Sequence, residues 1–316
     1  MKFRTEVVIP PAPFQISHLN KIMMIGSCFV ENISSKMLST GFSIHVNPFG
    51  IVYNPVSIAN GLYDLIKCKN YSENELFLHK EIYHSFSHHS RFSGMNKETV
   101  LDNINKNMLE SSNFLRQSDI LIITFGTANV YCLVSSKQVV SNCHKLPAKL
   151  FHEERLTVAF IAEQWNLLIQ AIRELNPNLK ILFTVSPIRH WKDGANENQL
   201  NKATLLLAIN ELIKTNKDCF YFPAYEIMID DLRDYRFYAE DMIHPNTQAI
   251  NYIWEKFGDA YFSENTKELI KEWENIQQVF NHKPFNPDSE EYQSFLEKGK
   301  KKKEKFLKNN PSFKNS

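Results

Sequence analysis

Ser27 stands where a serine could act as a nucleophile. It follows an apolar run that ends at Gly26 and precedes Cys28, Phe29 and an amphipathic segment, Val30–Leu38. This pattern predicts a buried strand, a tight corner and a helix start. Unpaired N–H groups and the dipole favour negative charge at a helix N-terminus. The hydroxyl could therefore attack a carbonyl while neighbouring amides stabilise the oxyanion; alternatively, Ser27 only caps the helix.

A base for that serine occurs far downstream, in the sequence DMIHP. Asp241 and His244 lie three positions apart, so both side chains could project from one side of a loop or a single turn. The carboxylate would orient the imidazole, which would take the serine proton and return it to the leaving group. In the simpler interpretation, Asp241 caps the turn and His244 packs or bonds to a carbonyl.

Cys28 is the rival nucleophile, because a helix N-terminus activates a thiolate. A free cysteine beside a corner usually packs as a small apolar residue, so Ser27 is preferred. The five cysteines, at positions 28, 68, 132, 143 and 219, are scattered and form no CxxC pair. This spacing indicates neither a disulfide framework nor a zinc cluster.

Several more polar residues could contact a substrate. The histidines of the run YHSFSHHSRFSG, at 84, 88 and 89, have no cysteine or carboxylate at a ligand-like spacing, so we favour a pocket wall over a metal site and expect no metal and no cofactor. Arg189 could clamp an anionic group or pair with a carboxylate in 230–234. The candidate substrate contacts are His84, Arg91, Asn142, His144, Arg189 and His190.

Strands and helices alternate along most of the chain. After the apolar run before Gly26, strands are predicted at 42–46, 119–125, 180–185 and 219–222, and helices at 57–68, 99–117, 156–175, 199–215 and 247–262. The alternation predicts an α/β protein with a parallel sheet covered by helices on both faces. Sites in such sheets lie beyond the carboxyl ends of the strands. The loops GSCF, NPFG, GTAN and SPIRH would meet there.

Some segments do not follow this alternation. We expect a leading strand at 3–9, an irregular excursion at 70–98 and a small hairpin at 130–140. We place the catalytic domain at 1–262. Residues 263–316 are expected to form a helical extension that ends in a lysine-rich, disordered tail around KGKKKKEKF.

The composition excludes several classes of protein. The chain has 316 residues, is 43% hydrophobic and carries a net charge of +1. It can bury a sizeable core, and its charge balance does not favour a nucleic-acid partner. It has no apolar run of membrane-spanning length, and prolines interrupt an N-terminus that lacks the apolar core of a signal peptide. We therefore expect a cytoplasmic protein.

Five segments together resemble the GSCFA family, which is related to the SGNH (GDSL-like) hydrolases. They are GSCF at 26–29, NPFGIVYNP at 47–55, FGTANVY at 125–131, FTVSPIRHWKDGANENQLNKATLLLA at 183–208 and YRFYAEDMIHPN at 235–246. The resemblance covers roughly residues 1–260, and Val30 stands where the family name would place alanine. It implies a flavodoxin-like three-layer fold and serine esterase chemistry.

The resemblance also assigns site residues. Ser27 matches the nucleophile of the first SGNH block, and Asp241 and His244 match the DxxH of the last. Gly50 is placed like the second-block glycine, whose N–H joins that of the serine in the oxyanion hole. The third block reads GTAN in place of the usual GxND, so either Thr127 or Asn129 would supply the side-chain donor.

These observations predict a serine esterase, or acyl hydrolase, of the SGNH type. Its substrate would be a small O-acyl ester, and the resemblance suggests an O-acetyl carbohydrate. An acyltransferase would use the same Ser27, His244 and Asp241, so transfer to an acceptor stays open beside hydrolysis. A non-catalytic ligand-binding module and a cysteine hydrolase that uses Cys28 also stay open. The sequence does not indicate an oligomeric state.

Overall fold

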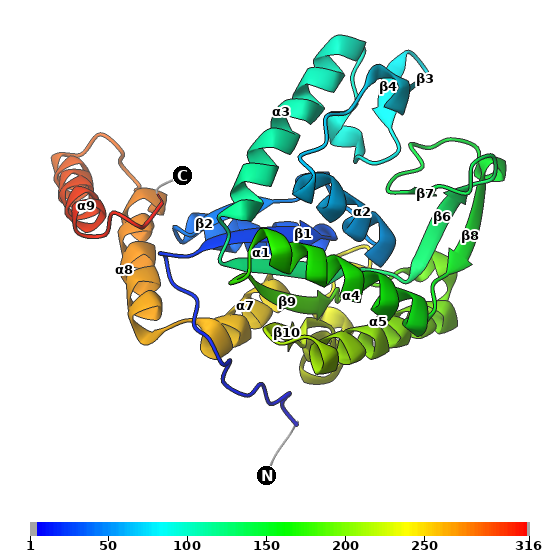
Figure 1. Ribbon diagram of the computed structural model, residues 1–316. Coiled ribbons are helices and arrows are strands. Elements are labelled where there is room, and N and C mark those ends of the chain that lie inside the picture. Colours follow the sequence, from blue (N-terminus) through cyan, green and yellow to red (C-terminus); the bar gives the residue numbers. More distant parts are fainter. Residues whose placement is uncertain (1–4, 315–316) are drawn as a thin grey trace.

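A five-stranded parallel sheet forms the centre of the computed structural model, which describes residues 5–314 (Figure 1). Its strands lie in the order β10-β9-β5-β1-β2, and every neighbouring pair is parallel. Numbered along the chain, this is the flavodoxin-like order 2-1-3-4-5. The predicted α/β class is confirmed. The strands are β1 (Lys21–Gly26), β2 (Ser43–Val46), β5 (Ile120–Phe125), β9 (Lys180–Val185) and β10 (Cys219–Phe222).

The sheet is apolar on both faces because its strands are apolar at nearly every position. Along β1, Met23 and Ile25 pack into the core on one face, and Ile22 and Met24 pack into the core on the other. Successive side chains of a strand point to opposite faces. A strand buried on both sides therefore reads as a continuous apolar run, which is why these strands were predictable.

Helices cover each face of the sheet. Four helices supply most of the helical side chains of one core, and two supply most of those of the other. On the first face lie α2 (Pro55–Ile66), α3 (Lys97–Arg116), α4 (Val158–Leu175) and α5 (Ala195–Thr215), and on the second lie α1 (Cys28–Ser39) and α7 (Thr247–Tyr261). Polar side chains cap most of these helices, among them Ser27 on α1 and Asn246 on α7. The result is the predicted three-layer architecture.

Two small antiparallel sheets lie outside the central one. The excursion at 70–98 contains the hairpin of β3 (Leu76–His79) and β4 (Ile82–Ser85). The predicted hairpin at 130–140 is present as β6 (Asn129–Leu133) and β7 (Val139–Val140), but β6 also pairs with β8 (Phe151–Arg155), which was not predicted. The remaining short elements are η1 (Glu73–Glu75), η2 (Ser90–Phe92), η3 (Ala148–Leu150), η4 (Trp191–Asp193), α6 (Ala224–Glu226), the π-helical η5 (Ile227–Leu232) and η6 (Tyr235–Phe237).

The lysine-rich end of the chain is helical, which corrects the expected disorder. After α8 (Glu264–Asn281), the segment forms α9 (Glu290–Asn309), which contains the whole lysine run. Trp273, Phe306 and Phe313 make a small apolar core between these helices, so the lysines are the solvent-facing side of an amphipathic helix. Figure 1 shows α8 and α9 on the side of the molecule away from β6 and β8.

The strand predicted at 3–9 is absent from the part of that range that the structure describes. Residues 5–9 form no strand, and positions 3 and 4 of the predicted strand lie outside the described residues. Among the helices of residues 5–314, none combines the length and apolar composition needed to cross a bilayer.

Candidate active site

Ser27 lies at the corner between β1 and α1. It is the N-cap of α1, and its Oγ accepts a hydrogen bond from the Phe29 N–H at 3.4 Å. The corner is tight because a Cβ at Gly26 would lie 2.4 Å from the Thr124 carbonyl oxygen on the neighbouring strand. Only glycine permits that approach. The serine is therefore held at the carboxyl end of β1, beside the first-turn amides of α1.

Asp241 and His244 form a tightly bonded pair on the loop before α7. Asp241 Oδ2 lies 2.6 Å from His244 Nδ1, and Asp241 Oδ1 accepts the N–H groups of Ile243 (2.9 Å) and His244 (3.0 Å). These two backbone bonds, followed by the bond to the imidazole, lower the pKa of Asp241 to about 2. The carboxylate is thus ionised and fixes His244 with Nε2 as its free ring nitrogen.

Arg189 holds this loop from the side of β9. Its guanidinium donates to the Met242 carbonyl at 2.9 Å, and its backbone N–H donates to the Ile243 carbonyl at 3.2 Å. The guanidinium also stacks on Trp191, with Cζ 3.9 Å from the ring centroid. Among the described residues, Arg189 makes no ion pair with residues 230–234, so that prediction does not fit the structure.

A single cleft of about 360 Å³ brings these groups together at the carboxyl ends of the strands. Ser27 and His244 both line it, although more than two hundred residues separate them in the chain. Ser27 is buried, with 2% of its surface exposed, and lies at the base of the cleft. The lining residues come from the loops after β1, β2, β5 and β9, the small β6–β8 sheet and the loop before α7.

Gly50 does not fit the oxyanion role that was predicted for it. Its N–H donates to the Asn47 carbonyl at 2.8 Å, and Gly50 is not among the residues that line the cleft. Its Cα faces His89 and Arg91, where a Cβ would clash. The amide is therefore used to close its own loop and is not available to a substrate.

Thr127 and Asn129 both line the cleft but differ in their free donors. The Asn129 side-chain amide already donates to Glu153 (3.1 Å) and Asp193 (3.4 Å). Thr127 Oγ1 accepts the Asn129 backbone N–H at 3.1 Å, which leaves its own O–H available. Thr127 is therefore better suited than Asn129 to donate to an oxyanion.

Cys28 also lines the cleft, yet its surroundings do not activate it. Burial, followed by the nearby Glu31 carboxylate, raises the pKa of the Cys28 thiol. A thiol is nucleophilic only as the thiolate. The structure thus favours Ser27 over Cys28.

Of the six predicted substrate contacts, only Arg189 and His190 reach the cleft. Burial, with smaller contributions from Lys202 and His244, lowers the pKa of His190 to about 3, so the ring is neutral. The remaining four residues make their contacts elsewhere and serve the packing of the excursion. The rings of His84 and His144 pack in a tilted arrangement with centroids 4.5 Å apart. Asn142 accepts the His144 N–H, and Arg91 donates to the Asn47 carbonyl.

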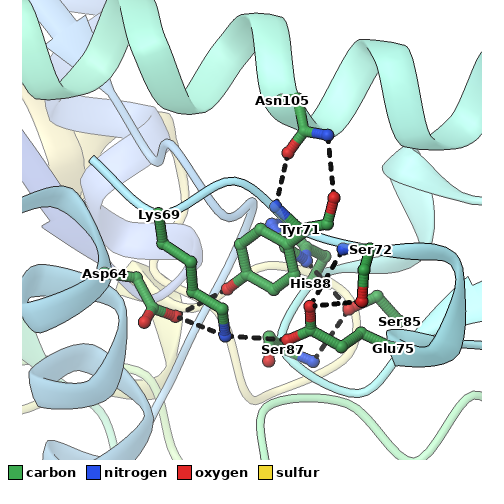
Figure 2. Close-up of polar contacts among 9 residues, drawn as sticks. All are labelled: Asp64, Lys69, Tyr71, Ser72, Glu75, Ser85, Ser87, His88 and Asn105. Carbon is green, nitrogen blue, oxygen red and sulfur yellow. Dashed lines mark hydrogen bonds and ion pairs between the residues drawn. The ribbon is translucent and has the colours of Figure 1, made fainter. Parts of the chain in front are cut away.

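A polar network surrounds His88 of the histidine run (Figure 2). Tyr71 donates to Asp64 at 2.6 Å, while its backbone exchanges two hydrogen bonds with Asn105 on α3. Lys69 joins Asp64 (3.7 Å) to Glu75 (2.8 Å). These bonds fasten the excursion to α2 and α3.

His88 lies beneath that network as a structural residue. It is 1% exposed, bonds Ser85 Oγ at 3.0 Å through Nδ1, and meets the Tyr71 ring edge-on. Burial lowers its pKa to about 3. Within residues 5–314, no group of three or more His, Cys, Asp or Glu side chains is arranged to hold a metal ion.

The cleft contains residues that sequence analysis did not single out, among them Tyr53, Asn54, Glu153, Trp191 and Asp193. Tyr53 and Asn54 belong to the segment NPFGIVYNP, so their motif was a usable signal. Glu153 lies on β8, and nothing local indicated that β8 would pair with β6 beside the cleft.

Comparison with known proteins gave matches at the level of families and solved structures. The sequence matches the model described as the GSCFA family over residues 21–257. Residues 273–316 match the model of the C-terminal domain of GSCFA domain proteins. None of the curated protein sequences matches the chain.

The similar solved structures have low sequence identity. A family 3 carbohydrate esterase of Clostridium thermocellum is 11% identical, with 80% of this chain and 97% of that chain covered and a TM-score of 0.37. A family 3 carbohydrate esterase from Talaromyces cellulolyticus is 11% identical, with 80% of this chain and 98% of that chain covered and a TM-score of 0.36. An acetyl xylan esterase from Butyrivibrio proteoclasticus is 9% identical, with 76% of this chain and 63% of that chain covered and a TM-score of 0.36.

Proposed function

Since this chain belongs to the GSCFA family, we propose that it is a serine esterase whose reaction takes place in the cleft between Ser27 and His244. One observation supports this proposal most directly. The same cleft contains a hydroxyl at a helix N-terminus and an imidazole whose Nδ1 lies 2.6 Å from an ionised carboxylate. Nucleophilic acyl transfer needs this combination of nucleophile, base and orienting acid.

In the proposed reaction, Ser27 Oγ attacks the ester carbonyl carbon while its proton passes to His244 Nε2. Asp241 holds the imidazole and stabilises its charged form. The first-turn amides of α1 and the Thr127 hydroxyl donate to the oxyanion. Collapse of the intermediate breaks the bond to the alcohol, which leaves with the proton from His244. Water then attacks the acyl-enzyme by the same route.

The lining of the cleft suits a small acyl group on a hydroxyl-rich alcohol, such as an O-acetyl carbohydrate. Asn129, Glu153 and Asp193 offer polar groups that can bond to hydroxyls, and Trp191 is 47% exposed although Arg189 covers part of its ring. An exposed aromatic face of this kind can pack against the apolar face of a ligand. The acyl side has little room because Ser27 lies at the buried base of the cleft.

The test is Ser27→Ala with p-nitrophenyl acetate as the substrate. We expect kcat to fall on the order of 1000-fold or more, because the covalent step is lost. Ser34→Ala is the matched control: this serine is also buried on α1, but it bonds only to the Glu31 carbonyl. It should retain wild-type turnover.

Labelling with a fluorophosphonate separates a serine esterase from a binding module. Wild-type protein should be labelled and Ser27→Ala should not. Folded wild-type protein that resists labelling and does not turn over the ester would instead be a binding module. Unchanged turnover in Ser27→Ala would remove Ser27 from the mechanism.

A further inference from the structure

Ser186 is the direct partner of the proposed nucleophile. Ser27 Oγ donates to Ser186 Oγ at 3.0 Å, and Ser186 has no exposed surface. Ser186 Oγ also accepts the Ile188 N–H at 3.3 Å. Among the described residues, no hydrogen bond joins Ser27 to His244, so the Ser27 proton points toward β9 and away from the proposed base. Ser186 does not line the cleft and lies below its base.

Lys202 fixes the backbone on which Ser186 lies. From α5, its Nζ donates to the carbonyls of Ser186 (2.8 Å) and Gly126 (2.7 Å). These two residues directly follow the neighbouring strands β9 and β5. Lys202 is 1% exposed, and no carboxylate pairs with it in the described part of the chain. Burial lowers its pKa to about 7.

A buried lysine is costly to a fold because its charged form loses its hydration, and packing alone would be served as well by an apolar side chain. This lysine instead satisfies two buried carbonyls next to Ser27 and Thr127. Their loops thereby keep a fixed separation at the base of the cleft.

We propose that Ser186 is a further catalytic residue that hydrogen-bonds Ser27 Oγ throughout the reaction, and that Lys202 is the residue that positions it. This inference rests on the proposed esterase function. In the resting state Ser186 accepts the Ser27 O–H. When that proton passes to His244 and the bond from Oγ to the acyl carbon forms, the Ser186 hydroxyl rotates and donates to Ser27 Oγ. It donates again when Ser27 Oγ leaves the acyl carbon during deacylation.

Ser186→Ala tests the first half of the proposal, with kcat and KM for p-nitrophenyl acetate and the fluorophosphonate labelling rate as readouts. We expect kcat and the labelling rate to fall about 10- to 100-fold, the range for a hydrogen bond to a charged group. KM should stay within about 3-fold, because a residue that does not line the cleft contributes little to ground-state binding. Ser112→Ala is the matched control, since Ser112 is equally buried but bonds the Leu65 carbonyl on α2.

The double variant Ser186→Ala/Lys202→Met tests the second half. If Lys202 acts through Ser186, the double variant should lose about as much kcat as Ser186→Ala alone, because Lys202 has no hydroxyl left to position once Ser186 is alanine. Losses that multiply would overturn the positioning role, and Ser186→Ala gives its own answer should Lys202→Met not fold.

The outcomes also separate the two proposals. Ser186→Ala with kcat within about 3-fold of wild type, alongside an inactive Ser27→Ala, overturns this inference and leaves the esterase intact. An active Ser27→Ala overturns both.

Discussion

At the scale of single residues, each proposed role in the site falls to one hydrogen-bonding group. One carboxylate, that of Asp241, orders its own turn through two backbone N–H groups and orients His244 through its second oxygen. One hydroxyl, that of Thr127, is left free where the neighbouring Asn129 amide is engaged by carboxylates. The proposed roles follow from which hydrogen-bonding groups are already used.

The bonds to Asp241 predict a pH dependence of stability. Its pKa is lowered from 3.8 to about 2 in the folded protein. Between about pH 2 and about pH 4, Asp241 binds more protons in the unfolded chain than in the folded protein. The stabilisation that the ionised Asp241 gives the folded protein is therefore present above about pH 4 and is lost as the pH falls toward 2. Measured by calorimetry at about pH 5 and about pH 2, the Tm of wild type should fall further than that of Asp241→Asn. Equal falls in the two proteins would contradict the expected contribution.

At the scale of elements, the loop after β9 assembles the site. It carries Ser186 to Ser27, places His190 in the cleft, and uses Arg189 to hold the loop that bears His244. These contacts join the loop after β1, the loop after β9 and the loop before α7 at one edge of the sheet. Loops at this edge are where a flavodoxin-like sheet places its sites.

Arg189→Met should therefore impair catalysis by loosening the His244 loop. We expect kcat to fall about 3- to 10-fold with a smaller change in KM, because a hydrogen bond to a carbonyl and the cation–π contacts with Trp191, Tyr235 and Tyr238 are lost. Steady-state kinetics with p-nitrophenyl acetate measure kcat and KM of the variant. Arg155→Met is the control, since the Arg155 side chain makes an exposed ion pair with Glu197 at 2.9 Å. Equal losses in both variants would indicate a general charge effect.

At the scale of the whole molecule, the C-terminal extension packs at the amino ends of the strands, the end of the sheet opposite the cleft. The Phe313 ring covers Gly41 and packs near His18, and the Lys314 N–H donates to the Gly41 carbonyl at 2.7 Å. Trp273 Nε1 donates to the Ser39 carbonyl at 2.9 Å. Gly41 precedes β2, so these contacts lie at the amino ends of the strands, whereas Ser27 follows a strand.

Phe313→Ala should accordingly destabilise the protein and spare its chemistry. Removing a buried phenylalanine, here 4% exposed, costs roughly 3 kcal/mol of unfolding free energy. Urea denaturation measures that loss, and kcat of the folded variant should be unchanged. Phe285→Ala is the control because that ring is fully exposed. If both variants unfold at the same urea concentration, the extension does not stabilise the core.

The sequence by itself determined the layered architecture. Strands β9 and β10 were predicted with their observed bounds, because a strand buried on both faces is apolar at consecutive positions and needs no distant information. The family resemblance also followed from local segments, and the Asp241–His244 pair could be predicted because one short turn brings the two side chains together.

Only the tertiary structure decided which polar groups meet. The Ser27–Ser186 bond spans 159 positions, and the two carbonyls bound by Lys202 follow different strands. The Gly50 amide is engaged within its own loop, and the lysine run is ordered because Trp273 and Phe313 give α9 an apolar partner. The sequence gives the type of each side chain. Whether a donor is free, or whether a helix has a packing partner, depends on neighbours that folding brings together.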